Sequence, residues 1–405
     1  MSRRLGDESP VWQQIRRGVA PGGDAIREVA TTGLATLGTG GVRGLDRGLR
    51  SQLLGAGPLD PLLAEPGVTD VAVNGDGSVW VDRGAGMQRV DLDLGDVEAR
   101  RHLVVRLAGL AGRRLDETAP YVDGQLPSGV RMHAILPPLV AGGPHLTLRV
   151  PGSRRVSLAE LGAAGMFPVE WLDVLQALMV RRVAFVVSGG TGAGKTTLLA
   201  ALLALTGADE RLVLVEDVRE LAVQHPHVVR LEARPANVEG AGEVTLAVLV
   251  RQALRMRPDR LVVGEVRGAE VRELLSALNT GHEGGCGTVH ANTAHDVVPR
   301  FEALGALGGM TPAAVHAQLV SAVRVILHVR RSVAADPRSG RGRRLETVAV
   351  VRPAPAGSPD RAPRSVEALT WDGRSVTTGP AWPELAALAG LDVTGGLSRQ
   401  HGVGS

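Results

Sequence analysis

The feature that most constrains this chain is a glycine-rich segment, Gly-Gly-Thr-Gly-Ala-Gly-Lys-Thr, which runs from Gly189 to Thr196. The apolar run Ala184–Val187 precedes it, and a stretch of helix-favouring residues begins at Lys195. Glycines at this spacing allow successive backbone N–H groups to curl around phosphate oxygens at a helix start, where the helix dipole also favours negative charge. The order of strand, loop and helix therefore predicts a phosphate-binding loop inside an α/β domain.

Lys195 strengthens this prediction because it is the only lysine among the 45 lysine and arginine residues of the chain. Every other basic position is arginine, so the compact ammonium stands at the one place where a phosphate cradle needs it. We expect Lys195 to contact the β- and γ-phosphates of ATP and the Thr196 hydroxyl to be a ligand of Mg²⁺. The predicted nucleotide-binding residues are Gly189, Gly190, Thr191, Gly192, Ala193, Gly194, Lys195, Thr196 and Thr197.

The length of 405 residues exceeds what a single hydrophobic core usually supports, so we expect two or three domains. A break in the pattern at Pro151-Gly152-Ser153 separates a small α+β domain from the rest of the chain. The expected divisions are a flexible or helical extension over 1–57, an α+β N-terminal domain over 58–150, linker helices over 151–180, the main α/β domain over 181–330, and C-terminal hairpins with a mobile tail over 331–405.

Strand-like runs alternate with helical stretches in the main domain, which is typical of a mostly parallel sheet. Its strands are expected at Ala184–Val187, Leu212–Val215, Val228–Leu231, Leu261–Val263 and Gly287–Val289, and its helices at Lys195–Leu205, Thr245–Met256 and Ala269–Leu278. Later strands are expected at Val323–Val329, Leu345–Val351 and Val366–Trp371. Before the main domain, strands are expected at Val68–Val73, Val79–Asp82, Val130–Leu136 and Leu146–Val150, a helix at Glu98–Leu110, and two helices between Leu158 and Met179.

Composition excludes several classes of protein. The chain contains no apolar run of about 18 residues, the length that a membrane-spanning helix needs. The segment Met1–Glu8 lacks the hydrophobic region of an export signal, so we expect a cytoplasmic protein. The single cysteine, Cys286, excludes an intramolecular disulfide and cannot form a zinc site alone.

Acidic residues follow two of the expected strands. Glu216 and Asp217 follow Leu212–Val215, and Glu265 follows Leu261–Val263. The carboxyl ends of parallel strands meet at one edge of a sheet, so these carboxylates are expected near the phosphate-binding loop. We predict that Glu265 holds the Mg²⁺ shell and polarises the attacking water.

Two histidines, His282 and His290, lie eight positions apart and flank a glycine-rich stretch. No cysteine or carboxylate recurs beside them at the spacing of a zinc site. This pattern favours a polar sensor of the γ-phosphate over a metal site.

These four motifs, in this order, resemble the type II/IV secretion ATPase superfamily. The segment from Leu254 to Gly268 resembles its tight-adherence pilus assembly branch, which is close to the conjugal transfer-type ATPases. The resemblance covers about residues 58–330. It implies a RecA-like P-loop motor domain with a mostly parallel sheet, preceded by a small α+β domain, in a ring that is usually a homohexamer.

The resemblance also implies roles for individual residues. It implies that Glu265 is the catalytic acid, that Glu216 is a second acid, and that His290 contacts the γ-phosphate. It implies further that arginines of the N-terminal domain complete the site, and Arg131 and Arg149 match those positions.

The expected function is that of an ATP-hydrolysing cytoplasmic motor for pilus assembly or secretion across the cell envelope. Its expected partners are further copies of itself and an inner-membrane platform protein, through which it associates peripherally with the membrane. A conjugation-type secretion ATPase or a pilus-retraction ATPase shares all four motifs and stays an alternative. A nucleic-acid translocase is disfavoured because aromatic residues, which stack on bases, make up only 2% of the chain. A scaffold that binds but does not hydrolyse ATP is disfavoured by the acids and histidines.

Overall fold

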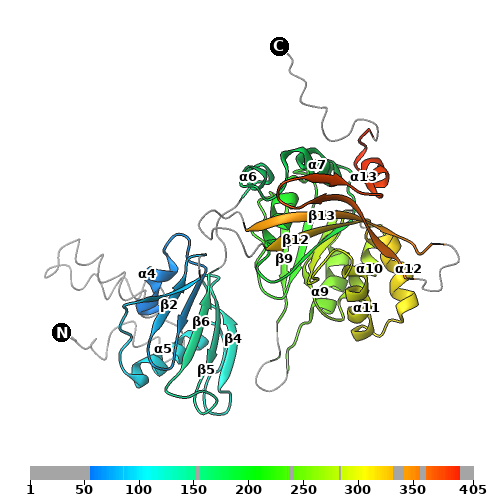
Figure 1. The fold of residues 1–405 in the computed structure, drawn as a ribbon. Coiled ribbons are helices and arrows are strands. Elements are labelled where there is room, and N and C mark those ends of the chain that lie inside the picture. Colours follow the sequence, from blue (N-terminus) through cyan, green and yellow to red (C-terminus); the bar gives the residue numbers. More distant parts are fainter. Residues whose placement is uncertain are drawn as a thin grey trace. The chain divides into compact units, whose positions relative to one another are not determined.

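A computed structural model describes residues 55–84, 86–150, 156–234, 236, 241–281, 284–331, 342–355 and 362–392 (Figure 1). The chain forms two compact units, Met1–Pro151 and Gly152–Ser405. Nearly all of the expected extension over 1–57 lies outside the described residues, as do His282 and most of the expected mobile tail.

The first unit is a six-stranded antiparallel sheet with the order β3-β2-β1-β6-β5-β4. Its strands are β1 (Asp70–Val73), β2 (Val79–Asp82), β3 (Met87–Val90), β4 (Tyr121–Gln125), β5 (Arg131–Ile135) and β6 (His145–Arg149). Its helices are η1 (Gly57–Leu59), α4 (Asp60–Leu63) and α5 (Val97–Leu110). Alternate residues of β1, β2, β5 and β6 are buried, so one face of the sheet forms the core. The predicted strands and helix are confirmed, whereas β3 and β4 were not foreseen.

The second unit contains a nine-stranded sheet with the order β15-β14-β13-β12-β7-β11-β10-β8-β9. Its strands are β7 (Phe185–Gly189), β8 (Leu212–Glu216), β9 (Val228–Glu232), β10 (Arg260–Val266), β11 (Cys286–Val289), β12 (Val325–Arg331), β13 (Arg343–Arg352), β14 (Arg364–Trp371) and β15 (Val376–Thr378). The strands from β12 to β9 in this order are parallel to one another, and β13, β14 and β15 continue the sheet in antiparallel pairs. The predicted α/β architecture with a mostly parallel sheet is confirmed.

Helices cover both faces of this sheet (Figure 1). Residues of α6 (Leu158–Ala163), α7 (Leu172–Val180), α8 (Lys195–Leu203) and α13 (Trp382–Ala389) pack in one cluster. Residues of α9 (Leu246–Ala253), α10 (Val271–Leu278), α11 (Val297–Leu307) and α12 (Pro312–Ala322) pack in the other. Two short helices, η2 (Val169–Trp171) and η3 (Leu254–Met256), complete the unit. Alternate strand residues enter the two clusters, because successive side chains point to opposite faces.

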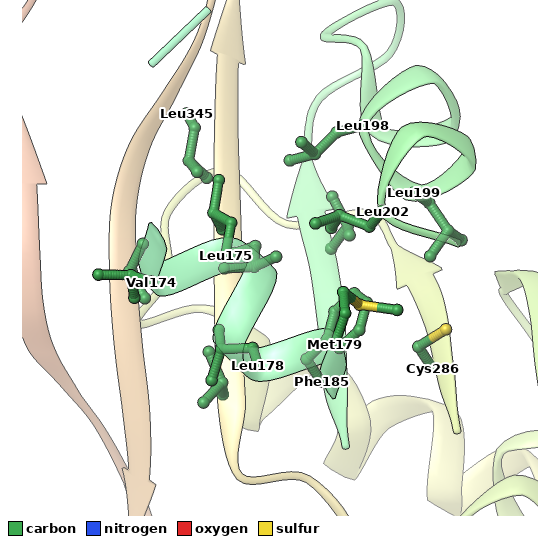
Figure 2. Packing of buried hydrophobic residues seen from close by; sticks show 14 of the residues in the cluster. Val174, Leu175, Leu178, Met179, Phe185, Leu198, Leu199, Leu202, Cys286 and Leu345 are labelled. Carbon is green, nitrogen blue, oxygen red and sulfur yellow. The ribbon is translucent and has the colours of Figure 1, made fainter. Parts of the chain in front are cut away.

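The helices expected to form a linker over 151–180 contribute to the core of the second unit. Leu175 and Leu178 of α7 are at most 1% exposed and pack with Phe185 of β7 and Leu198 of α8 (Figure 2). Cys286 lies buried in the same cluster. The apolar face of α7 therefore packs against the sheet that carries the glycine-rich loop.

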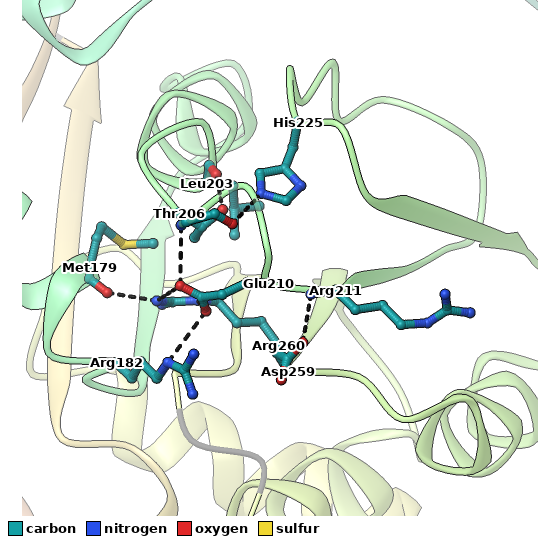
Figure 3. A network of polar contacts seen from close by, with 10 residues as sticks. Met179, Arg182, Leu203, Thr206, Glu210, Arg211, His225, Asp259 and Arg260 are labelled. Atoms are coloured by element: carbon teal, nitrogen blue, oxygen red, sulfur yellow. Dashed lines mark hydrogen bonds and ion pairs between the residues drawn. The ribbon is translucent and has the colours of Figure 1, made fainter.

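A buried ion pair binds the amino ends of the parallel strands together (Figure 3). Arg260, the first residue of β10, is 0% exposed, and its Nε donates to Glu210 Oε2 over 2.7 Å. Its Nη2 donates to the carbonyl oxygen of Met179 over 2.6 Å, while Arg182 Nε lies 3.5 Å from Glu210 Oε2. This network ties the end of α7 and the starts of β8 and β10 into one rigid edge.

Candidate functional site

The glycine-rich loop connects β7 to α8 at the opposite, carboxyl edge of the sheet. Gly189, Gly192 and Gly194 have φ angles of 151°, 69° and 99°, which residues with a Cβ atom rarely adopt. A Cβ atom at Gly189 would also lie 2.2 Å from the carbonyl oxygen of Val329, so only glycine fits there. The loop thus brings its backbone N–H groups to the start of α8, the arrangement that suits a phosphate.

Lys195 is the first residue of α8 and is only 7% exposed. Its Nζ donates to the carbonyl oxygens of Gly189 and Gly190, over 3.0 Å in each case. Burial lowers the pKa of Lys195, and the charges of Glu265 and Glu220 oppose that shift. The one ammonium of the chain is therefore held at the mouth of the loop.

Glu265 and His290 meet beside this ammonium. His290 Nε2 lies 2.6 Å from Glu265 Oε1 and 3.3 Å from Lys195 Nζ. Both side chains keep more than a third of their surface exposed, so a ligand can reach them. Burial, and next the charge of Lys195, lower the pKa of His290, which favours the neutral imidazole at pH 7. The structure thus brings together three residues that the sequence placed in three separate motifs.

Glu216 ends β8 and is 3% exposed. Its Oε1 accepts hydrogen bonds from the backbone N–H groups of Glu220 and Leu221, over 2.9 Å in each case. Burial raises its pKa, although these two hydrogen bonds favour the charged form. The absence of a side chain at Gly264 leaves room for Glu216, since a Cβ atom there would lie 2.7 Å from Glu216 Cγ. Its carboxylate is bound to the loop that follows β8.

Glu220 is a member of the site that the sequence analysis did not select. Glu216 fixes its backbone, and its charge raises the pKa of Lys195 second only to that of Glu265 among the charges near Lys195. The signal was present in the sequence, since Glu220 follows Glu216 by four residues in the same acidic cluster.

Oxygen donors for Mg²⁺ are present at the loop. Thr196 is half-buried in the first turn of α8, Thr197 is exposed, and the Glu265 carboxylate lies beside Lys195. In the described part of the chain, no group of three or more His, Cys, Asp or Glu residues could hold a metal ion. That donor set suits Mg²⁺, which usually takes one or two protein oxygens and completes its shell with phosphates and water.

Arg131 and Arg149 lie in the first unit. They are direct partners across β5 and β6, and Asp70 of β1 is the partner of Arg149 on its other side. The structure therefore gathers the two predicted arginines at one position of that sheet.

A second histidine, which is buried, supports the strand that leads into the loop. His328 of β12 is 2% exposed, and its Nδ1 lies 2.9 Å from Ser188 Oγ of β7. It also makes a hydrogen bond with the backbone of Asn292, two residues after His290. The loop strand and the segment that carries His290 are thus linked through one imidazole.

Comparisons with known proteins give a consistent result. The family described as "Type II/IV secretion system protein" matches residues 52–360. A Mycobacterium tuberculosis protein provisionally named for conjugal transfer is 56% identical over 314 residues, which cover 76% of this chain and 88% of that protein. The conjugal transfer protein TrbB of Rhizobium radiobacter is 33% identical over 285 residues, covering 69% and 83%.

Among solved structures, the pilus retraction motor PilT with bound ADP has the same fold. It superposes with a TM-score of 0.52 at 22% identity and covers 74% of this chain and 83% of its own. Within the described residues, no helix combines the length and the apolar character needed to cross a membrane.

Proposed function

Because this chain belongs to the type II/IV secretion system protein family, we propose that it is an ATPase that powers pilus assembly or secretion across the cell envelope. One observation carries the proposal: Lys195, Glu265 and His290 meet at the loop between β7 and α8. An ammonium can bind the phosphates, a carboxylate can orient the attacking water, and a neutral imidazole can form a hydrogen bond with a phosphate, all at one phosphate-binding loop.

Each residue of the proposed site has its own role. The loop from Gly189 to Gly194 and Lys195 bind the phosphates. Glu265 orients the attacking water and takes its proton, and His290 contacts the γ-phosphate as a hydrogen-bonding sensor. Thr196 and Glu265 would hold Mg²⁺, which would neutralise charge on the phosphates. Glu216, proposed from sequence as a second acid, acts by fixing the loop that carries Glu220.

Arg131 and Arg149 are proposed to complete the site in an assembled ring. Arginine donated to the developing charge on a γ-phosphate is worth about 10³ to 10⁵ in rate in other systems. The ring, with six subunits as the expected number, acts in the cytoplasm against an inner-membrane platform protein. No nucleic acid is expected as a partner.

A second candidate is a conjugation-type secretion ATPase. The observation that favours it is the naming of the relatives, since the proteins at 56% and 33% identity both carry names from conjugal transfer. The two candidates share the same site and differ in what the motor moves.

The test is steady-state phosphate release by the purified full-length chain with ATP and Mg²⁺, with native mass measured on the same sample. We expect turnover from a ring and no stimulation by single-stranded DNA. Mixing an Arg131→Ala chain with a Lys195→Ala chain should restore part of the activity if the arginine acts across a subunit boundary. A wild-type protein that binds ATP without releasing phosphate would refute the proposal.

A further inference from the structure

Two arginines of the strand pair β12–β13 lie against the glycine-rich loop. Arg331 ends β12, Arg343 begins β13, and the two are direct partners across the strands. A Cβ atom at Gly192 would lie 3.6 Å from Arg331 Nη1, and one at Gly194 would lie 3.4 Å from Arg343 Cδ. Both side chains therefore reach the two glycines that shape the loop.

The face of the sheet explains why these two arginines reach the loop. Arg331 shares a face with Val329, and Arg343 shares one with Leu345, because side chains alternate along a strand. Val329 and Leu345 are partners and pack in the same cluster as α8, whose first residue is Lys195. The hairpin thus presents two guanidinium groups on the side where the phosphate-binding helix begins.

The next pair of arginines, one position further from the ends of the two strands, has a different environment. Arg330 and Arg344 are also direct partners, but they lie on the opposite face. Arg330 Nη1 lies 3.2 Å and Arg344 Nη2 lies 2.9 Å from Glu346 Oε1. The chain therefore contains its own control, two arginine pairs of the same type in the same strands on opposite faces.

The position of the Arg331–Arg343 pair is fixed from both strands. The Leu345 N–H donates to the carbonyl oxygen of Met166 over 2.7 Å, and Met166 Cε would lie 3.5 Å from a Cβ atom at Gly194. On the other strand, the backbone of Val329 closely approaches Gly189. The end of β12 and the start of β13 are thus held against the loop by backbone contacts.

Charge balance indicates what these arginines bind. The carboxylates of Glu265 and Glu220 already act on Lys195, so its single positive charge faces negative charge before any nucleotide binds. A nucleotide triphosphate adds several more negative charges. Guanidinium groups bind phosphate oxygens in a bidentate manner and keep their charge at all physiological pH values.

We propose that Arg331 and Arg343 bind the nucleotide phosphates, as ligands from the same chain in addition to Lys195. The proposal rests on the proposed nucleotide site and adds to it a cationic flank from the β12–β13 side. It differs from the predicted roles of Arg131 and Arg149, which belong to the first unit.

The experiment measures binding rather than turnover. The affinity of the full-length chain for a fluorescent ATP analogue is measured, followed by its displacement by ATP and by inorganic tripolyphosphate. The variants are Arg331→Ala, Arg343→Ala and the double variant, with Arg330→Ala and Arg344→Ala as matched controls. Thermal unfolding verifies that each variant is folded, and Arg331→Lys and Arg343→Lys test whether charge alone is sufficient.

Each alanine variant at the loop should bind ATP and tripolyphosphate about tenfold or more weakly, the usual effect of losing one charged hydrogen bond. The affinity of the double variant should also depend less on salt concentration, because fewer ionic contacts remain to be screened. The lysine variants should bind more tightly than the alanine variants, and both controls should bind like the wild type.

Two outcomes would overturn the proposal. One is an unchanged ATP affinity in the folded double variant. The other is a loss of ATP affinity with an unchanged tripolyphosphate affinity, which would place the arginines at the base or ribose. If the wild type itself binds neither ligand, the proposed function fails, and that result is distinct from both.

Discussion

The two edges of the parallel sheet each carry a carboxylate paired with a nitrogen-bearing side chain, in opposite environments. At the amino edge, Arg260 and Glu210 pair over 2.7 Å and are 0% and 8% exposed. At the carboxyl edge, His290 and Glu265 pair over 2.6 Å, and their side chains are 38% and 36% exposed. The distances are nearly equal, so the two pairs differ in burial and in the charge of the basic partner, since Arg260 is always charged and His290 is neutral at pH 7.

Because of this difference in burial, we assign the amino-edge pair to stability and the carboxyl-edge pair to function. In the Arg260–Glu210 pair, Arg260 also donates a hydrogen bond to the carbonyl oxygen of Met179. Removing either partner would leave an unpaired charge in the core. The Glu265–His290 pair stands beside Lys195 and remains open to solvent, so its members can exchange partners with a ligand at low cost. We therefore expect substitutions at the amino edge to change the free energy of unfolding and those at the carboxyl edge to change turnover.

The largest effect is expected for Lys195→Arg. This change keeps the charge but replaces a compact ammonium by a larger planar group in a cradle where Lys195 is only 7% exposed. ATP turnover should fall about a hundredfold or more, close to the level of Lys195→Ala, a loss typical of removing one preorganised donor. The measurement is steady-state phosphate release on the three proteins, with native mass and unfolding midpoint as controls. Substantial turnover in Lys195→Arg would show that any cation suffices at this position.

The next effect concerns the amino edge. Arg260→Met leaves Glu210 buried without its main partner, so the free energy of unfolding should fall by about 3–5 kcal/mol. Adding Glu210→Leu should recover a large part of that loss, because the stranded charge is removed. Urea unfolding measures both variants. The turnover of the folded fraction should stay near the wild-type value, and a specific loss of turnover would break the separation of the two edges.

A smaller effect is expected for His328, the buried residue that links the loop strand to the segment that carries His290. Burial lowers the pKa of His328 below its usual value of 6.5, an effect that Arg330 adds to and that Glu346 and Asp296 oppose. Between the lowered pKa and 6.5 the unfolded chain binds more protons, so this stability is present above pH 6.5 and is lost as the pH falls.

The measurement is the free energy of unfolding of the wild type and His328→Gln as a function of pH. The wild type should lose up to about 1.4 kcal/mol per pH unit relative to the variant within that window. Parallel curves for the two proteins would mean that His328 titrates alike in the folded and unfolded chains.

The parts of the site predicted from the sequence are those encoded by local pattern. The loop from Gly189 to Lys195 was recognisable because its glycines are needed for backbone geometry and its neighbours form a strand and a helix. Glu265 was found because it follows an apolar run that forms β10, and in the structure it lies near the carboxyl end of that strand, whereas His290 was found from the histidine pair and the family resemblance. The superfamily predicted from these motifs is confirmed by the family match over residues 52–360.

The parts that were missed depend on contacts between distant segments. Arg331 and Arg343 reach the loop only because of the register of β12 with β13 and of β12 with β7. Whether an arginine reaches the loop depends on the register of its strand and on the face of the sheet to which it points. Neither can be recognised from a basic segment of sequence. Likewise, α7 resembles a linker helix until its apolar residues are seen to pack with Phe185 and Leu198.

The most direct test of this account makes the same substitution at both edges. Glu265→Gln and Glu210→Gln each remove one negative charge without changing side-chain volume, and ATP turnover and the free energy of unfolding are measured on both proteins. We predict that Glu265→Gln loses turnover by orders of magnitude and unfolds like the wild type, whereas Glu210→Gln unfolds more easily and its folded fraction hydrolyses ATP at the wild-type rate. Wild-type turnover in Glu265→Gln, or a lost activity in folded Glu210→Gln, would contradict the assignment of catalysis to the carboxyl edge.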